Sequence, residues 1–228
     1  MESIRLREIP LVELFRYYGA SSKCSAYAKL YSVLDQSLCK RKDTFRILEI
    51  GTASGASARA LATRYPNAQI VTIDINPSCA TIFSQHANIT ALTCDCSSEP
   101  ELKQVLEAAG HGFDVVVDDG SHMSKDVIGA FKCIFPSLNK SWTYIIEDCD
   151  SIGNPGYSSW MQKKFGRKHS ENDRSAFLGL VDQLMQASDY WENYRIEFGY
   201  CRKALWIKGV GPDAIASSSV VSGAVTDS

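Results

Sequence analysis

The sequence predicts an α/β fold: a mostly parallel seven-stranded sheet with helices on both faces and a C-terminal antiparallel hairpin. From about residue 45, short runs of β-branched residues alternate with amphipathic segments, which is the pattern of a parallel sheet covered by helices. Near the C-terminus, RIEFGY and KALWIKG are typical of a closing hairpin. A chain of 228 residues is long enough for one domain with one substantial core.

Each expected element has its own sequence signal. Before the hairpin, strands are expected in RILEIG ending at Gly51, AQIVTIDI ending at Ile75, ITALTC ending at Cys94, FDVVVD ending at Asp118 and WTYIIED ending at Asp148. A helical pattern follows each strand, for example in ASARALATRY, ELKQVLEAAG and MSKDVIGAFKCIF, and Pro136 ends the last of these. The segment SIGNPGYSSW is expected to be a loop, and residues from about 173 to 189 another helix.

Three regions are expected along the chain. Residues 1–44 form an N-terminal helical cap segment, because LVELFRYYG and AYAKLYSVLDQSL carry apolar faces at helical spacing. Residues 45–210 hold the sheet, and residues 211–228 form a disordered tail that lacks Lys, Arg, aromatic residues and periodicity. The first region either packs on the sheet or also covers a ligand crevice.

Composition argues against some classes of protein. The net charge of -2 and the scattered Lys and Arg residues leave no basic face for nucleic acid. No apolar run approaches the roughly 18 residues that span a bilayer, and the first residues lack the apolar core of a secretory signal, so we expect a soluble, cytoplasmic protein. The 8 cysteines form no CxxC pair, which favours reduced thiols. A homo-oligomer is left open.

The first strand runs into a glycine-containing loop, LEIGTASGAS, that precedes a helix. Glycine permits positive φ and lets a ligand approach the backbone, and the helix N-terminus offers free N–H groups. The middle position of a nicotinamide-binding fingerprint is Ala53 here, which disfavours an oxidoreductase. The candidate ligand contacts in this stretch are Glu49, Gly51, Thr52, Ser54, Gly55 and Ser57.

Acidic residues end the successive strands. Asp74 and Asp95 follow the second and third strands, and each taken alone is as well explained by a helix N-cap. The carboxyl ends of parallel strands form one ligand crevice, so these acids and Glu49 are expected to converge there. The fourth and fifth strands end in VDDGSH and IIEDCD, and such a group of carboxylates needs a cation, for which Mg²⁺ is the natural candidate.

The spacing E-x-G-x-x-x-G resembles the class I S-adenosylmethionine-dependent methyltransferases, which have a Rossmann-like fold. The resemblance implies that the loop wraps the amino-acid end of the cofactor, that Asp74 binds the ribose hydroxyls and that Asp95 contacts the adenine amine. A carboxylate suits a ribose diol because it accepts two hydrogen bonds at once. Asp118 and Tyr27 complete the candidate cofactor contacts.

Three further segments resemble the macrocin and mycinamicin sugar O-methyltransferase family: DDGSH, YIIED, and YGASSKCSAYAKLYSVL with its Lys23, Tyr27 and Tyr31. Ser22 departs from that family's usual acid. The resemblance implies that Asp119, Glu147 and Asp148 hold Mg²⁺ and that Asp119 and His122 are catalytic. His122 would be the general base that deprotonates an acceptor hydroxyl. Taken alone, His122 is better explained as a solvent-exposed residue in the first turn of a helix, with Ser121 as its cap.

The expected function is therefore Mg²⁺-dependent methyl transfer from S-adenosylmethionine to a hydroxyl of a small glycoside or similar natural product. Tyr157 and Trp160 either stack on the small-molecule acceptor or simply pack. A catechol-type O-methyltransferase is an alternative, against which the pair Glu147-Asp148 argues mildly. A non-catalytic cofactor-binding protein with the same fold is another.

Overall fold

The structure is a computed structural model that describes residues 6–83, 86–186, 195–201 and 203–210. Its 7-stranded sheet has the order β3-β2-β1-β4-β5-β7-β6. The predicted tail, residues 211–228, lies outside the described residues. The strands are β1 Phe45–Ile50, β2 Ala68–Asp74, β3 Ile89–Thr93, β4 Phe113–Asp118, β5 Leu138–Ile146, β6 Arg195–Cys201 and β7 Ala204–Val210.

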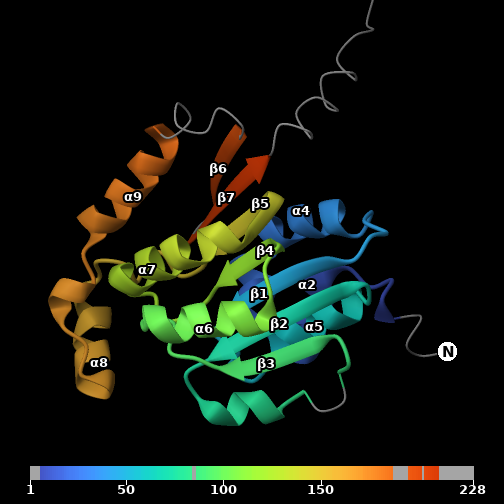
Figure 1. The fold of residues 1–228 in the computed structure, drawn as a ribbon, viewed down its shortest axis with the longest axis horizontal. Coiled ribbons are helices and arrows are strands. Elements are labelled where there is room, and N and C mark those ends of the chain that lie inside the picture. The colour runs from blue at the N-terminus through green and yellow to red at the C-terminus, as the bar shows by residue number, and fades with distance from the viewer. Residues whose placement is uncertain (1–5, 84–85, 187–194, 202, 211–228) are drawn as a thin grey trace, which may run out of the picture.

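The sheet is parallel from β3 through β5, and β7 pairs antiparallel with both β5 and β6. Figure 1 shows β3 at one edge and the red β6–β7 hairpin at the other. All residues of β4 are buried, as expected for a central parallel strand that reads as a continuous apolar run. The predicted α/β class, with its parallel sheet and closing hairpin, is confirmed.

Helices cover both faces of the sheet. One apolar core joins α2, α4 and α5 to residues such as Ile47, Val117 and Ile145, and a second core joins α6, α7 and α9 to the opposite face. The helices are α2 Leu11–Tyr18, α3 Ser21–Ser25, α4 Ala28–Leu38, α5 Ala56–Arg64, α6 Glu99–Ala109, α7 Ser124–Ile134, α8 Pro155–Phe165 and α9 Arg174–Gln186, with 3₁₀ turns η1 Pro77–Thr81, η2 Phe135–Ser137 and η3 His169–Glu171.

The register makes the parallel strands end level with one another. Ile50 pairs with Ile73 and with Asp118, and Asp118 pairs with Ile146. The residues that follow these positions therefore lie along one edge of the sheet. This is the edge at which ligands bind in open α/β sheets.

Strand alternation decides which acids face the N-terminal helices. Side chains two residues apart on a strand share a face. The acids two residues after Ile47, Val117 and Ile145 therefore point toward α2–α4, as those apolar residues do. Those acids are Glu49, Asp119 and Glu147. Asp118 lies on the opposite face, where its carboxylate accepts a 3.4 Å hydrogen bond from the Tyr144 hydroxyl.

One predicted loop is wrong. SIGNPGYSSW was expected to lack regular structure, but α8 begins inside it at Pro155. The Asn154 side chain accepts hydrogen bonds from Gly156 N and Tyr157 N, and Pro155 occupies the first helical turn, so the helix has a complete N-terminal signal. The dipeptide Asn-Pro was the sequence evidence for this helix.

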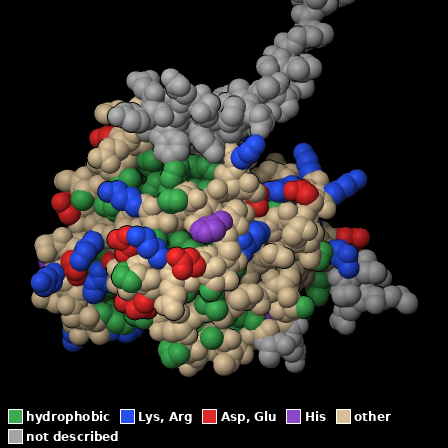
Figure 2. Space-filling model, viewed as in Figure 1, with side chains coloured by type: hydrophobic (Ala, Val, Ile, Leu, Met, Phe, Trp, Pro, Cys, Tyr) green, Lys and Arg blue, Asp and Glu red, His purple; other side chains and the backbone are tan. Residues whose placement is uncertain are grey.

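Other features of the described chain bear on the class of protein. None of its helices combines the length and apolar composition needed to cross a bilayer. Basic and acidic side chains are interspersed on the face shown in Figure 2. The seven cysteines that the structure places are free thiols, as predicted: Cys24, Cys39, Cys79, Cys94, Cys96, Cys133 and Cys149.

Candidate active site at the carboxyl ends of the strands

The glycine loop packs directly against the end of β4. Gly51 has φ +92°, and a Cβ built on it would lie 2.1 Å from the Asp119 carbonyl oxygen. Gly55 has φ +73°, and its Cβ would lie 2.5 Å from the Phe83 ring. Both glycines therefore suit the left-handed conformation, and Gly51 is also required by its close approach to the Asp119 backbone.

Asp74 shapes this loop. Its Oδ2 accepts 2.9 Å hydrogen bonds from Thr52 N and Ala53 N, and its Oδ1 accepts a 2.8 Å bond from Asn76 N. Ala53 has φ +46°, a left-handed conformation unusual for a residue with a Cβ. The carboxylate thus holds the loop in a strained shape, and the second lone pair of Oδ1 can still serve a ligand.

The remaining loop residues differ in what they offer. The Thr52 hydroxyl is buried and lies 2.7 Å from the Thr72 hydroxyl, whereas Ser54 is exposed. Glu49 Oε1 and Ser57 Oγ are buried and have no hydrogen-bond partner. Burial raises the pKa of Glu49 to about 7, and the charge of Lys23 opposes that rise.

Asp95 and Asp118 flank the site with different surroundings. Asp95 Oδ1 accepts from Ser97 N at 2.9 Å and from Ser97 Oγ at 2.7 Å, so one oxygen closes a local turn. Burial raises the pKa of Asp118 to about 7. A cofactor contact by either residue stays a prediction.

Asp119, His122 and Asp148 converge. One ligand atom of each lies within 4.8 Å of the others. His122 Nε2 is 3.8 Å from Asp119 Oδ1 and 3.7 Å from Asp148 Oδ2. His122 has φ +52° and Asp148 φ +50°, and together with Ala53 they are the non-glycine residues with positive φ in the described chain. Such strain concentrates at functional sites, where the fold holds side chains in required positions.

The N-terminal helices complete this acidic cluster, which we define as Asp119, Glu147 and Asp148. Lys23 Nζ lies 2.8 Å from Asp119 Oδ2 and 2.9 Å from Glu147 Oε1. The Tyr31 hydroxyl also donates to Glu147 Oε1. Glu147 therefore faces the N-terminal segment, and its Oε2 is buried without a partner.

Tyr27 contacts the same cluster. It is fully buried, its hydroxyl donates to Asp148 Oδ1, and Asp148 N donates to that hydroxyl at 3.1 Å. Its predicted contact with a cofactor stays untested, because the contact that the structure shows is with Asp148. The position of Lys23 and Tyr31 was not predicted, although the segment that carries them had been noted.

The electrostatics of the cluster follow from its burial. Burial disfavours the charged form of Lys23, but the charges of Asp119 and Glu147 outweigh it and raise the pKa of the ammonium. Burial raises the pKa of Glu147 to about 7, against the opposing charge of Lys23. The cluster therefore depends on a positive charge at its centre.

Aromatic residues of α8 stand beside His122. The ring centroids of Tyr157 and His122 are 6.2 Å apart, and those of Tyr157 and Trp160 are 5.6 Å apart. The Tyr157 hydroxyl donates to Ser121 O at 2.7 Å, which fixes α8 next to the turn that carries His122. Trp160 is 46% exposed, so this ring is available to a ligand.

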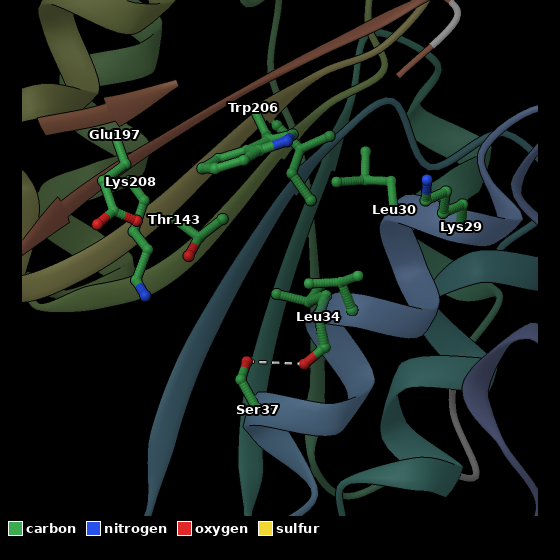
Figure 3. A pocket seen from close by; sticks show the side chains of 10 residues that line it. Lys29, Leu30, Leu34, Ser37, Thr143, Glu197, Trp206 and Lys208 are labelled. Carbon is green, nitrogen blue, oxygen red and sulfur yellow. Dashed lines mark hydrogen bonds between the residues drawn. The ribbon is translucent and has the colours of Figure 1, made fainter. Parts of the chain in front are cut away.

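A separate groove lies between α4 and strands β5–β7 (Figure 3). Its volume is about 510 Å³, and Leu30, Leu34 and Trp206 supply much of its apolar wall, with Lys29 and Lys208 also lining it. None of the acidic cluster lines this groove. Its walls offer no group of candidate metal ligands, so we do not assign the chemistry there.

Known proteins show the same fold and similar sequences. Residues 47–141 match the family described as "Methyltransferase domain". Mycinamicin VI 2''-O-methyltransferase of Micromonospora griseorubida is 27% identical over 159 residues, which are 67% of this chain and 37% of that protein. L-olivosyl-oleandolide 3-O-methyltransferase of Streptomyces antibioticus is 31% identical over 125 residues, which are 51% of this chain and 31% of that protein.

A solved structure, the MycE methyltransferase of the mycinamycin biosynthetic pathway in complex with Mg, SAH and mycinamycin VI, aligns with a TM-score of 0.68 at 20% identity. The alignment covers 96% of this chain and 57% of that one. The chain spans little more than a third of the length of its first curated relative. Residues 47–141 thus match a methyltransferase domain, and the chain has the Rossmann-like fold of the MycE methyltransferase and resembles the mycinamicin and macrocin O-methyltransferases in sequence.

Proposed function

We propose that this chain is an S-adenosylmethionine-dependent O-methyltransferase that requires Mg²⁺ and acts on a hydroxyl of a small glycoside or similar natural product. The observation that carries the proposal is the level ending of the strands, which sets the glycine loop beside Asp119, His122 and Asp148. Relatives of similar sequence are named as O-methyltransferases of mycinamicin VI and of L-olivosyl-oleandolide, which supports an acceptor of this kind.

The glycine loop fits the cofactor. Gly51 and Gly55 hold the left-handed conformations of the loop, and Glu49 Oε1 and Ser57 Oγ are buried polar atoms without partners. The cofactor, when bound, supplies an electrophilic methyl group on a sulfonium. Asp74 would accept hydrogen bonds from the ribose hydroxyls while it keeps the loop in shape, and Asp95 would contact the adenine.

The acidic cluster fits a hard divalent cation. Asp119 and Asp148 present oxygens to the same point, next to His122; Glu147 does not converge with them there, but its Oε2 is a buried oxygen without a partner. Asp119, Glu147 and Asp148 would hold Mg²⁺, whose charge makes a nearby hydroxyl easier to deprotonate. His122 would accept the proton from that hydroxyl through Nε2, which already faces both aspartates.

Tyr157 and Trp160 would orient the acceptor. Their rings extend from His122 toward the surface, and a sugar or an aromatic ring stacks well on such a platform. The orientation of the acceptor matters because catalysis of methyl transfer consists largely of aligning oxygen and methyl group.

The decisive experiment incubates the purified chain with labelled S-adenosylmethionine and a panel of glycoside, catechol and nucleoside acceptors, with Mg²⁺ or with EDTA. We expect label in a glycoside product only when Mg²⁺ is present. Activity on catechols alone would replace the glycoside assignment, and full activity in EDTA would exclude a catalytic metal. Asp148→Asn should abolish turnover, and Asp150→Asn, at an exposed acid two residues away, should leave it unchanged.

A further inference from the structure

Lys23 places a buried ammonium inside the acidic cluster. Its side chain is only 3% exposed, and Nζ contacts Asp119 Oδ2 and Glu147 Oε1 at 2.8 and 2.9 Å. An ammonium withdrawn from water destabilises the fold unless carboxylates compensate it, and removal of either partner leaves the other uncompensated. The helix α3 that carries Lys23 has only 5 residues, so these ion pairs help to fix its position.

The ammonium and the candidate cation site share Asp119 through different oxygens. Oδ2 of Asp119 is bound to Lys23, whereas Oδ1 is 3.8 Å from His122 Nε2. Asp148 joins the His122 side of the cluster, with Oδ2 3.7 Å from the same nitrogen. A divalent cation and the ammonium can therefore occupy the cluster together.

The charges of the cluster balance only in this combination. Asp119, Glu147 and Asp148 carry three negative charges when ionised, and Lys23 neutralises one of them. The remaining two equal the charge of one divalent cation. Without Lys23 the buried Glu147 would lack a lysine or arginine partner among the described residues until a cation bound.

We infer that Lys23 is a fixed counter-ion that allows the acidic cluster to fold without a divalent cation and lowers the affinity of the cluster for that cation. The inference rests on the proposed function, because it takes the cluster to be a cation site. Lys23 acts through Asp119 and Glu147, so it is a positioning residue and not a catalytic one.

The test compares Lys23→Met with the wild type and with Lys29→Met, which removes an exposed lysine from the neighbouring helix α4. In EDTA, Lys23→Met should melt roughly 6 to 15 °C below the wild type, as expected for a broken buried ion pair, and Lys29→Met should not. Mg²⁺ should restore most of the loss. Calorimetry should show Mg²⁺ binding to Lys23→Met about tenfold more tightly than to the wild type, because one repelling charge is gone.

Two results would overturn the inference: a melting temperature of Lys23→Met in EDTA equal to that of the wild type, or an affinity for Mg²⁺ that does not rise. A wild type that binds no divalent cation would overturn it as well. A wild type that binds Mg²⁺ but transfers no methyl group counts against the proposed function alone.

The double variant Lys23→Met/Glu147→Gln covers the case in which the single variant does not fold. It removes the uncompensated carboxylate together with the ammonium, so it should melt above Lys23→Met in EDTA. If Lys23 only filled space, the second substitution would not raise the melting temperature, and that result would contradict the counter-ion role.

Discussion

The glycine loop and the acidic cluster occupy the same edge of the sheet but are assembled in different ways. Asp74 reaches back only 22 residues to bind Thr52 N, within one strand-loop-helix-strand unit. Lys23 joins Asp119 and Glu147 across 96 and 124 residues. Local sequence determines the loop, whereas the cluster exists only once the N-terminal segment has packed on the sheet. Substitutions in the two regions should therefore have separable effects on the cofactor, the cation and stability.

The largest expected effect is on kcat and comes from His122, which lies beside the acidic cluster. His122→Asn removes the proposed base and should lower kcat about 10²- to 10⁴-fold, and asparagine tolerates the positive φ of this position. Affinity for S-adenosylmethionine and for Mg²⁺, both measured by calorimetry, should be nearly unchanged. His169→Asn, at an exposed histidine, is the control. If His122→Asn weakens Mg²⁺ binding in proportion to kcat, His122 is a metal ligand instead.

The next largest effect is on stability and comes from Gly51, where the glycine loop contacts the Asp119 backbone. Gly51→Ala forces a Cβ against the Asp119 carbonyl, whereas Gly112→Ala introduces the same positive-φ strain where no atom lies within 4 Å of the Cβ. We expect Gly51→Ala to lower the free energy of unfolding by roughly 2 to 4 kcal/mol more than Gly112→Ala does. Urea denaturation of both variants measures this difference. Equal losses would mean that the loop can shift away from β4.

A smaller effect is expected on the cofactor side. Asp74→Ala should weaken binding of S-adenosylmethionine by on the order of 1 to 3 kcal/mol, because the ribose bonds and the support of the loop are both lost. Calorimetry with the cofactor and then with Mg²⁺ checks this, and the affinity for Mg²⁺ should stay within about threefold of wild type. If Asp74→Ala weakens Mg²⁺ binding as much as it weakens cofactor binding, the glycine loop and the acidic cluster do not have separable effects.

The smallest effect concerns pH and stability. Burial raises the pKa of Glu49 to about 7 in the folded chain, above the ordinary glutamate value of 4.5. Between these values the unfolded chain releases a proton that the folded chain keeps, so this group makes the protein less stable as pH rises from about 4.5 to 7. Glu49→Gln removes that dependence and should gain stability over the wild type by up to about 3 kcal/mol at pH 8. If the difference in unfolding free energy between Glu49→Gln and the wild type does not change between about pH 4.5 and 8, the pKa of Glu49 is not raised in the folded chain.

The sequence determined much of the fold because its signals were local. Buried apolar runs such as that of β4 predicted the central strands, and Pro136 correctly marked the end of α7. The helix α8 was missed because Gly, Pro and Ser suggested a loop, although Asn154 and Pro155 form a helix start. The cap residue and the proline that start the helix were present in the sequence, but the many Gly, Pro and Ser residues around them favoured a loop.

The candidate site was less accessible to the same reasoning. Strand ends predicted that Asp119 and Asp148 would meet, since the register of a parallel sheet brings them together. Nothing in the spacing of Lys23 or Tyr31 indicated that they would bind Glu147, because that contact depends on how α3 and α4 pack. The orientation of His122 depended on a left-handed backbone conformation that the sequence does not announce.

Close packing of Gly51 on the Asp119 carbonyl connects the two ligands thermodynamically. A cofactor that orders the glycine loop would also restrict the backbone of Asp119, and a cation held by Asp119 would restrict the loop. Linkage requires the effect to be reciprocal: whatever factor the cation contributes to cofactor affinity, the cofactor contributes to cation affinity. If both ligands bind as proposed, this one backbone contact would make their two binding equilibria cooperative.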